Sequence, residues 1–487
     1  MDFYKKALKI IHLSTTARNI SMKGFFSHQS QPSPKKNLLS QNFLLITTSG
    51  GGGHLQAAQA KRNEVFEKYP EAKIVEKNVV ETAGGKYLGK FMIDFVWNKA
   101  QRKGSVHALN LCAFSIPIFD FLFWIPIFYQ IYHLLKTYDI DHVIDTQPMA
   151  SSAIASAVYF YKKISNKEIF IEKVLTELPT IKSAHYLKPL ARLGVKKRNL
   201  IRLSTIPPLK EPYLTEEDFW FAQAGLRQDQ VMYRPLPIRP SFLKKPNLFQ
   251  DPLELVISYK DEKEKNLLEN LLPKNIKLDA GSYLLPLPKE DIVVSLMLGS
   301  QPPQQAFLSY VENFITFVKN FHGVKNFWFF VFCSDKPSDP IPLQQRICSL
   351  VTSTENFPSH LRIIPMSNQK DHVIAPLYYR SDATITKAGG ITSMELLQTA
   401  QGQIWIHYEN SNSWIQKILG FYCKKNQGMP EWEYGNVLYL QNKKQAALIT
   451  PANFYAACDA CFGSKSNYLP QQELKQNPSK ILSSHGA

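Results

Sequence analysis

The chain has 487 residues, of which 44% are hydrophobic and 12% aromatic. That composition excludes a disordered protein, and the length favours two or three domains over one. The 57 Lys and Arg residues against 40 Asp and Glu give a net charge of +17, which favours anionic partners: nucleic acid, an anionic membrane or phosphorylated small molecules. Six cysteines in this length argue against a disulfide scaffold, and the lone pair Cys458-x-x-Cys461 predicts no metal site.

Residues 1–40 form a basic leader with many Ser and Asn residues, which we expect to be flexible. No long apolar core follows its basic start, which argues against a secretory signal. A transit peptide, a surface-anchoring helix and a disordered leader all fit this segment.

The next part of the chain, residues 41–242, alternates strands with helices. Strands are expected at 42–48, 74–80, 141–145 and 169–175, and an amphipathic helix from Leu55 to about Tyr69. This alternation predicts an α/β domain with a parallel sheet and right-handed crossovers.

Residues 111–135 are nearly all apolar, with Asp120 as the one formal charge. The length would suffice for a membrane span, but Pro117, Pro126 and Asp120 argue against one. We expect packed helices with one apolar face offered to a bilayer; core helices are the alternative. The residues assigned to this membrane or acceptor side combine basic and aromatic types: Lys90, Phe91, Phe95, Trp97, Phe121 and Trp124.

A second α/β block resumes near residue 288, after a charged stretch at 243–287 that we interpret as a linker or insertion. Strands are expected at 292–297, 327–332 and around 362–364, and a helix at 305–319. The second domain is therefore placed at 288–450, followed by a C-terminal helix and tail at 451–487.

A glycine cluster, Gly50, Gly51, Gly52 and Gly53, joins the first strand to the first helix. Such a loop lets a ligand approach the backbone, and the following helix start offers donors to an anion. The cluster matches neither the Walker loop nor the dinucleotide fingerprint. His54 at its rim could bind the donor, orient an acceptor hydroxyl or act as a base, or it could be structural.

The second domain has a comparable turn at residues 381–397, where a strand, a small-residue turn and a helix follow one another. Backbone amides from Gly389 to Thr392 would face an anion, and Thr392 and Ser393 add hydroxyls. Glu395 lies one turn into the helix, where it could accept both hydroxyls of a ribose. A solvated acid complementing the helix dipole is the alternative for Glu395.

Four stretches in this order resemble glycosyltransferase family 28: S-G-G-G-G-H at 49–54, the A-G-L and R-P-L-P-I-R-P-S-F segments within 221–242, I-T-K-A-G-G-I-T-S-M-E-L-L at 385–397, and P-E-W-E-Y-G-N at 430–436. That family includes monogalactosyldiacylglycerol synthases, bacterial diacylglycerol glucosyltransferases and the enzyme that adds N-acetylglucosamine to lipid-linked muramyl peptide. The likeness covers roughly 42–242 and 290–440.

The resemblance implies the GT-B architecture, in which two Rossmann-like domains face a cleft, with the lipid acceptor on the first domain and a UDP-sugar donor on the second. It implies inversion by direct displacement without a metal or other cofactor, with His54 as the first candidate base and Glu177 as the second. The donor-binding positions that it implies are Ser300, Gln301, Gly389, Gly390, Thr392, Ser393, Glu395, Glu433 and Asn436.

Several residues depart from the family pattern. Trp432 replaces a Gln, Pro302 and Pro303 follow Ser300-Gln301, and Glu177 and Lys182 replace Asp and His. These departures bear on the donor sugar and on the acceptor side.

The leading interpretation is an enzyme that transfers a hexose or N-acetylhexosamine from a UDP-sugar to a membrane lipid such as diacylglycerol. It would work at the cytoplasmic face of an anionic membrane or in the cytoplasm, with no nucleic-acid partner. The alternatives are a sugar-nucleotide epimerase of the same fold and a non-catalytic relative that binds nucleotide or membrane.

Overall fold

The computed structural model describes residues 41–48, 52–83, 105–106, 109–110, 118–244, 252–272, 276–279, 281–299, 303–334, 341–409 and 428–463. The chain divides into two compact units, residues 1–39 and 40–487, and every described residue lies in the second. The predicted basic leader lies outside the described residues.

The first domain is built on a six-stranded parallel sheet in the order β2-β1-β3-β4-β5-β6. Its strands are β1 (Asn42–Thr47), β2 (Lys73–Asn78), β3 (His142–Asp145), β4 (Phe170–Val174), β5 (Ile201–Thr205) and β6 (Val231–Tyr233). Its helices are α2 (Gly52–Lys68), α3 (Val79–Ala83), α7 (Trp124–Thr137), α8 (Ser151–Ser165), α9 (Lys188–Ala191), α10 (Val195–Arg198) and α11 (Glu216–Ala224). Short 3-10 turns are η2 (Ala184–Leu187), η3 (Gln228–Gln230) and η4 (Pro240–Phe242).

The second domain has another six-stranded parallel sheet, in the order β12-β11-β10-β13-β14-β15. Its strands are β10 (Ile292–Met297), β11 (Phe327–Phe332), β12 (Leu361–Met366), β13 (Ala383–Thr386), β14 (Gln403–His407) and β15 (Ala447–Ile449). Its helices are α13 (Gln304–Lys319), α14 (Leu343–Ser353), α15 (Asp371–Arg380), α16 (Gly390–Thr399), α18 (Glu431–Lys444) and α19 (Pro451–Phe462). β11 is buried along its whole length, as expected of a parallel strand covered by helices on both faces.

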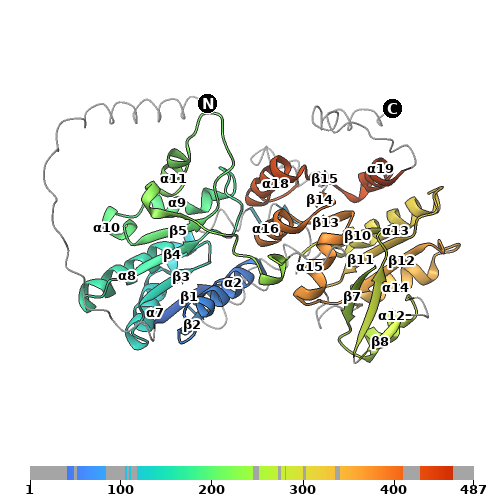
Figure 1. Cartoon of the computed structure of the whole chain (residues 1–487). Helices are drawn as coiled ribbons and strands as arrows, with labels where there is room; N and C mark the ends of the chain where they lie inside the picture. Colours follow the sequence, from blue (N-terminus) through green and yellow to red (C-terminus); the bar gives the residue numbers. More distant parts are fainter. Residues whose placement is uncertain are drawn as a thin grey trace. The chain divides into compact units, whose positions relative to one another are not determined.

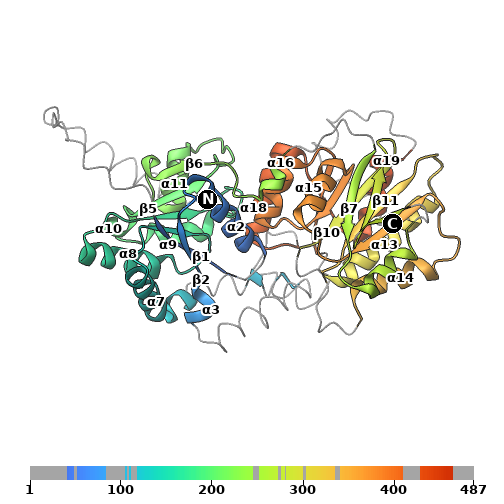
Figure 2. The ribbon, with the colours of Figure 1, turned by 60° about the horizontal axis from the view of Figure 1, so that its bottom comes forward.

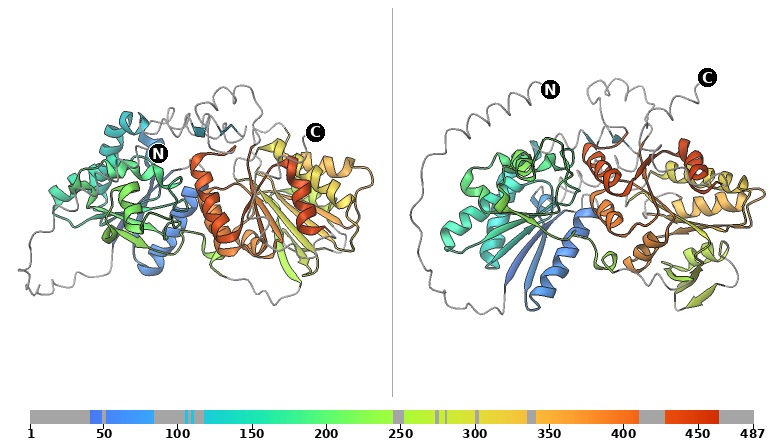
Figure 3. Two further views of the ribbon diagram at one scale, coloured as in Figure 1. Left: turned by 90° about the horizontal axis from the view of Figure 1, so that it is seen from above. Right: turned by 45° about the horizontal axis from the view of Figure 1, so that its top comes forward.

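Helices pair on the faces of these sheets. α7 and α8 lie side by side in the first domain (Figure 1). In the second domain α13 and α19 lie together near β11 (Figure 2), and α18 lies beside α16 (Figure 3). The ring of Phe454 on α19 packs edge-on against Tyr310 of α13, with 5.0 Å between ring centroids.

The stretch 243–287, interpreted from sequence as a linker or insertion, contains a small antiparallel sheet in the order β7-β9-β8. Its elements are β7 (Leu253–Ser258), α12 (Glu262–Glu269), β8 (Lys277–Asp279) and β9 (Ser282–Leu287). Leu255, Ile257 and Leu285 share one apolar core with Ile374 and Tyr378 of α15. This sheet is therefore packed onto the second domain.

Two parallel sheets with crossover helices confirm the predicted α/β class with two Rossmann-like domains. In each sheet the chain reverses its direction of strand addition beside one strand, β1 in the first domain and β10 in the second. Open parallel sheets bind ligands beyond the carboxyl ends of their strands at such a switch point. The topology thus directs the search for a site to the ends of β1 and β10.

Candidate functional site

A cavity of about 430 Å³ lies where the topology directs the search. The first domain contributes Gly52, Gly53, His54 and Gln56 from α2, and Thr176 and Glu177 beyond β4. The second domain contributes residues at the ends of four neighbouring strands and at the starts of two helices. They include Met297, Leu298, Gly299, Phe332, Ser334, Thr386, Lys387, Gly389, Gly390, Ile391, Thr392, His407, Glu409, Trp432 and Glu433. The volume and the mixed lining are typical of a small-molecule site.

His54 reaches the cavity from the first turn of α2 with its tautomer fixed. Its Nδ1 lies 2.8 Å from the carbonyl oxygen of Thr146. Because a carbonyl can only accept, Nδ1 carries the proton and Nε2 keeps its lone pair. Burial, opposed by the Thr146 hydrogen bond and aided by the charge of Lys173, lowers the pKa of His54 to about 4. His54 is therefore a neutral base at physiological pH.

A buried ion pair positions the Thr146 carbonyl. Lys173 Nζ on β4 lies 2.7 Å from Asp145 Oδ2 at the end of β3, and both side chains are almost fully buried. Asp145 Oδ1 also accepts the backbone N–H of Gln147 at 3.1 Å, and Lys173 donates to the Gln147 carbonyl. The turn after β3 is thus held from both sides, which fixes the ring of His54 through Thr146.

The start of α16 forms the opposite wall of the cavity. Its N-cap residue, Gly389, has no side chain to cap the helix, and its first turn contains no acidic residue. The N–H groups of Gly390, Ile391 and Thr392 therefore have no partner within the helix, and the helix dipole adds positive potential. A Cβ at Gly390 would collide with the Thr176 carbonyl and the Glu177 carboxyl, so only glycine allows the first domain to approach this closely. The geometry suits an anion such as a diphosphate.

Glu177 lies against this helix start in an uncharged form at neutral pH. Burial raises its pKa to about 8; the hydrogen bond from Asn436 opposes the shift and the charge of Glu433 adds to it. Asn436 Nδ2 donates to Glu177 Oε2 and, at 2.8 Å, to the Ala388 carbonyl, while its Oδ1 accepts the Leu178 N–H at 2.8 Å. Asn436 thereby ties the two domains together and holds Glu177 in place.

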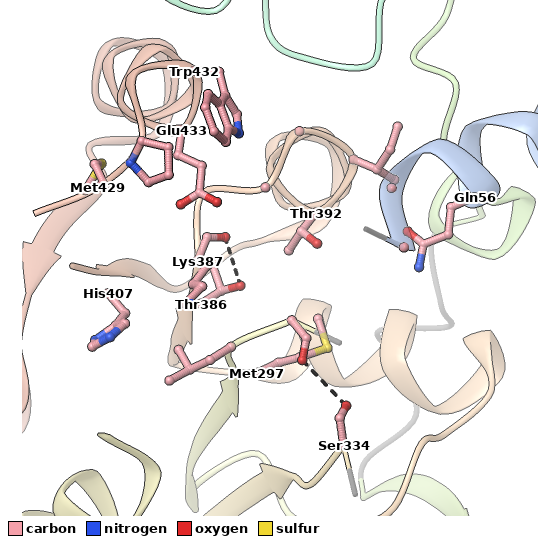
Figure 4. Close-up of a pocket in the computed structure, with 18 of the residues that line it drawn as sticks. Gln56, Met297, Ser334, Thr386, Lys387, Thr392, His407, Met429, Trp432 and Glu433 are labelled. Atoms are coloured by element: carbon pink, nitrogen blue, oxygen red, sulfur yellow. Dashed lines mark hydrogen bonds between the residues drawn. The ribbon is translucent and has the colours of Figure 1, made fainter. Parts of the chain in front are cut away.

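Charged side chains gather at the far end of the cavity, at the ends of β13 and β14 (Figure 4). Lys387 follows β13, Glu433 lies in the first turn of α18, and His407 with Glu409 ends β14. No carboxylate lies within ion-pair distance of Lys387 Nζ in the part of the chain that the structure describes. Burial raises the pKa of Glu433, Lys387 opposes the shift, and Glu409 adds to it.

Three predicted donor-binding residues do not line the cavity, and the structure corrects them. Glu395 is fully buried, and its two oxygens accept from Arg239 Nε and Nη2 at 2.7 and 2.9 Å, so it is paired with Arg239 and not exposed to a ribose. Ser393 is fully buried with its hydroxyl unpartnered among described residues. Asn436 is fully buried as the clamp described above. Helical periodicity explains this outcome, since α16 and α18 turn these positions away from the cavity, Glu395 toward Arg239 and Asn436 toward Leu178 of the first domain.

Of the other predicted positions, some line the cavity and some lie outside the described residues. Gly389, Gly390, Thr392 and Glu433 line the cavity together with His54 and Glu177. Gly52 and Gly53 also line it, but they belong to α2, which begins within the glycine cluster rather than after it. The remaining predicted positions lie outside the described residues: Gly50, Gly51, Ser300, Gln301, Lys90, Phe91, Phe95 and Trp97.

The predicted membrane side is represented by α7 and the turn before it. Phe121 is 81% exposed and Ile125 72% exposed, whereas Ile127 and Ile131 on the other face of α7 are buried. Trp124 is only partly exposed, and its indole N–H donates to Ser152 Oγ at 3.3 Å, so it anchors α7 to α8. No helix among the described residues is long and apolar enough to cross a membrane.

Sequence reasoning missed several residues of the site. Lys387, His407 and Glu409 line the cavity, and Arg239 and Asp371 form the ion pair that engages Glu395. The run Ile404-Trp405-Ile406 reads as a buried strand, and the polar His407 and Glu409 that follow it are the signal that could have found them. Within the described ranges no cluster of His, Cys, Asp or Glu is suited to hold a metal ion.

No family model and no curated protein matches the chain. Among solved structures, MurG from Acinetobacter baumannii is 10% identical with a TM-score of 0.39, covering 86% of this chain and 89% of that chain. The glycotransferase of kitacinnamycin is 9% identical with a TM-score of 0.43, covering 90% and 92%.

A UDP-GlcNAc 2-epimerase from Neisseria meningitidis bound to UDP-GlcNAc is 11% identical with a TM-score of 0.36, covering 86% of this chain and 98% of that chain. Every one of these TM-scores is below 0.5, so these likenesses carry no argument about the activity of this chain.

Proposed function

We propose that this chain is a glycosyltransferase that moves a hexose or N-acetylhexosamine from a UDP-sugar to a hydroxyl of a membrane lipid such as diacylglycerol. The observation that carries the proposal is the pairing in one cavity of His54, whose Nε2 keeps its lone pair, with the uncapped start of α16. A proton acceptor on one domain thus faces an anion cradle on the other. The four sequence motifs shared with glycosyltransferase family 28 point the same way.

In the proposed reaction His54 acts as the general base. Its Nε2 takes the proton from the acceptor hydroxyl, whose oxygen forms a bond to the anomeric carbon of the donor sugar. The bond from that carbon to the diphosphate oxygen breaks, and its electron pair leaves with UDP. Attack from the face opposite the leaving group inverts the anomeric configuration.

The second domain stabilises the leaving group in this proposal. The free amides at the start of α16 and the ammonium of Lys387 face the cavity that would hold the diphosphate. They supply in fixed positions the positive charge that the departing diphosphate needs, without a metal ion. Glu177 helps by being protonated, because an ionised carboxylate against Gly390 would repel the anion.

The exposed apolar residues of the first domain support work at a membrane. Phe121, Leu122, Ile125 and Tyr129 lie on or beside α7, and Phe160 on the neighbouring α8 has its ring 5.4 Å from that of Tyr132. Lys136 and Lys163 are exposed on the same two helices. Apolar and basic side chains together suit the surface of an anionic leaflet. We therefore place the enzyme peripherally on the cytoplasmic face of a membrane.

The test is a UDP-release assay with several UDP-sugars, each with a membrane lipid extract or with buffer alone. We expect release that depends on lipid, a labelled product that enters the organic phase, and loss of both with His54→Ala. Labelled product that stays in water as a new UDP-sugar would replace the proposal by an epimerase. UDP binding without turnover on any donor and lipid would replace it by a non-catalytic role.

A further inference from the structure

A buried hydrogen-bonded chain ends in the cavity at Glu409. Tyr310 Oη on α13 lies 2.8 Å from His407 Nδ1, and His407 Nε2 lies 3.2 Å from Glu409 Oε1. Tyr310 and His407 are almost completely buried, whereas Glu409 keeps 26% of its side chain exposed. His407 and Glu409 both line the cavity.

The direction of this chain follows from its last member. A carboxylate only accepts hydrogen bonds, so His407 Nε2 carries the proton and Nδ1 accepts from the Tyr310 hydroxyl. Tyr310 thereby fixes the tautomer of His407, which in turn fixes one oxygen of Glu409. Burial by itself would raise the pKa of Glu409, but the bond from His407 and the charge of Lys387 lower it below its ordinary value. Glu409 is therefore a positioned carboxylate whose second oxygen has no hydrogen-bond partner among the described residues and can accept from a ligand.

The charges around Glu409 indicate what that ligand carries. Glu433 and Glu409 approach the same space as Lys387, so that two carboxylates and one ammonium share this end of the cavity. Carboxylates accept strong hydrogen bonds from hydroxyl groups, and an anionic group placed directly against Glu409 would be repelled. Lys387 lies three residues before Gly390, so its ammonium can serve the diphosphate at the start of α16 while Glu409 and Glu433 serve the sugar.

We infer that Glu409, positioned by His407 and Tyr310, contacts hydroxyls of the donor sugar and, with Glu433, selects a neutral hexose over a hexuronic acid. This inference rests on the proposed function, because it assumes that the cavity holds a UDP-sugar. Glu409 lies outside the motifs shared with family 28, and it adds a carboxylate to the one at Glu433.

The test compares binding of UDP, UDP-glucose, UDP-galactose and UDP-glucuronate to the full chain by calorimetry. The tighter neutral sugar nucleotide should bind about tenfold or more tightly than UDP-glucuronate, because a charged hydrogen bond is replaced by a repulsion. Glu409→Gln should weaken that neutral sugar nucleotide by about tenfold, leave UDP unchanged and narrow the difference from UDP-glucuronate. Tyr310→Phe should weaken the binding of that neutral sugar nucleotide by a few-fold, because it removes only the hydrogen bond that holds His407.

Glu312→Gln is the matched control, because Glu312 is an exposed acid on α13 that does not line the cavity, and the substitution removes the same charge. It should leave all four affinities unchanged. Two results overturn the inference alone: UDP-glucuronate binding as tightly as the neutral sugars, or Glu409→Gln weakening UDP and UDP-hexose equally. Absence of binding by UDP itself overturns the proposed function and the inference with it.

Discussion

The two helices that border the cavity begin in the same way but are equipped differently. α2 follows β1 and α16 follows β13, and each helix has glycine at its first position. The first turn of α2 brings His54, whose tautomer is fixed by Thr146, whereas the first turn of α16 has no ionisable residue. The same strand-turn-helix geometry thus serves a proton acceptor in one domain and an anion cradle in the other. The side chains of the two helix starts, and not their fold, therefore determine which role each domain has.

Removing His54 should have the largest effect on catalysis. We expect His54→Ala to lower kcat by about 10²–10⁴-fold, the usual contribution of a general base, with little change in UDP affinity. The measurement is UDP release in single turnover beside UDP binding by calorimetry. His322→Ala, an exposed histidine, is the control. Equal losses in the rate and in UDP affinity would show that His54 holds the donor instead.

Glu395 tests whether a buried residue of α16 contributes to stability and not to UDP binding. Glu395→Gln leaves the buried Arg239 with Asp371 as its remaining ion-pair partner, at 2.6 Å. We expect the free energy of unfolding to fall by roughly 3 kcal/mol, as for other broken buried pairs, with UDP affinity nearly unchanged. Urea denaturation and UDP calorimetry measure the two effects. Normal stability with greatly weakened UDP binding would restore Glu395 as a ribose ligand.

Lys387 tests the anion side of the comparison. Lys387→Met removes the ammonium but keeps most of the side-chain volume, and UDP should bind about tenfold more weakly. Lys325→Met, an exposed lysine, is the matched control and should leave UDP affinity unchanged. If Lys387→Met does not change UDP affinity, the anion is bound by the backbone amides at the start of α16 without Lys387.

The pH dependence of kcat/KM should reveal the ionisation of one group at each helix start, His54 at α2 and Glu177 at α16. His54, with its pKa lowered to about 4, must be unprotonated, so kcat/KM should rise through pH 4. Glu177, with its pKa raised to about 8, must stay protonated, so kcat/KM should fall above pH 8. The fall should approach tenfold per pH unit for a single ionisation.

Glu177→Gln stays neutral at every pH and is the matched variant for this test. It should abolish the alkaline fall while retaining activity at pH 7 within a few-fold, since the hydrogen bond from Asn436 can be made to an amide oxygen. An alkaline fall that persists unchanged in Glu177→Gln would assign that limb to another group.

Much of the fold could be predicted from the sequence because its strands are short apolar runs between turn residues. The strand at 292–297 and the strand at 327–332 occur with the predicted bounds. The small sheet at β7, β8 and β9 was not predicted, because its strands are interrupted by charged residues and Pro286. Short strands of this kind, with charged residues and a proline, cannot be distinguished from a loop by their pattern of apolar and polar residues.

The site was predictable where its residues lie in a turn after a strand or in the first turn of a helix. Gly389 and Gly390 come within four residues of the end of β13, and His54 lies in the first turn of α2 after β1, so the strand-turn-helix geometry brings them to the cavity. Glu395 and Asn436 lie deeper in helices, and their partners Arg239 and Leu178 are distant in sequence. Neither helical phase relative to the cavity nor such long-range pairing can be obtained from a motif.

Asn436 gives the closed arrangement a sensitivity to pH. Its hydrogen bonds to Leu178 and Ala388 form a bridge between the domains around Glu177, whose pKa is raised by burial although the hydrogen bond from Asn436 lowers it. Separation of the domains would return the carboxyl of Glu177 toward its ordinary pKa of 4.5 from about 8. Between these values parting the domains releases one proton, so acidity favours closure and alkali favours release. Substrate exchange should therefore quicken in alkali while bond formation slows.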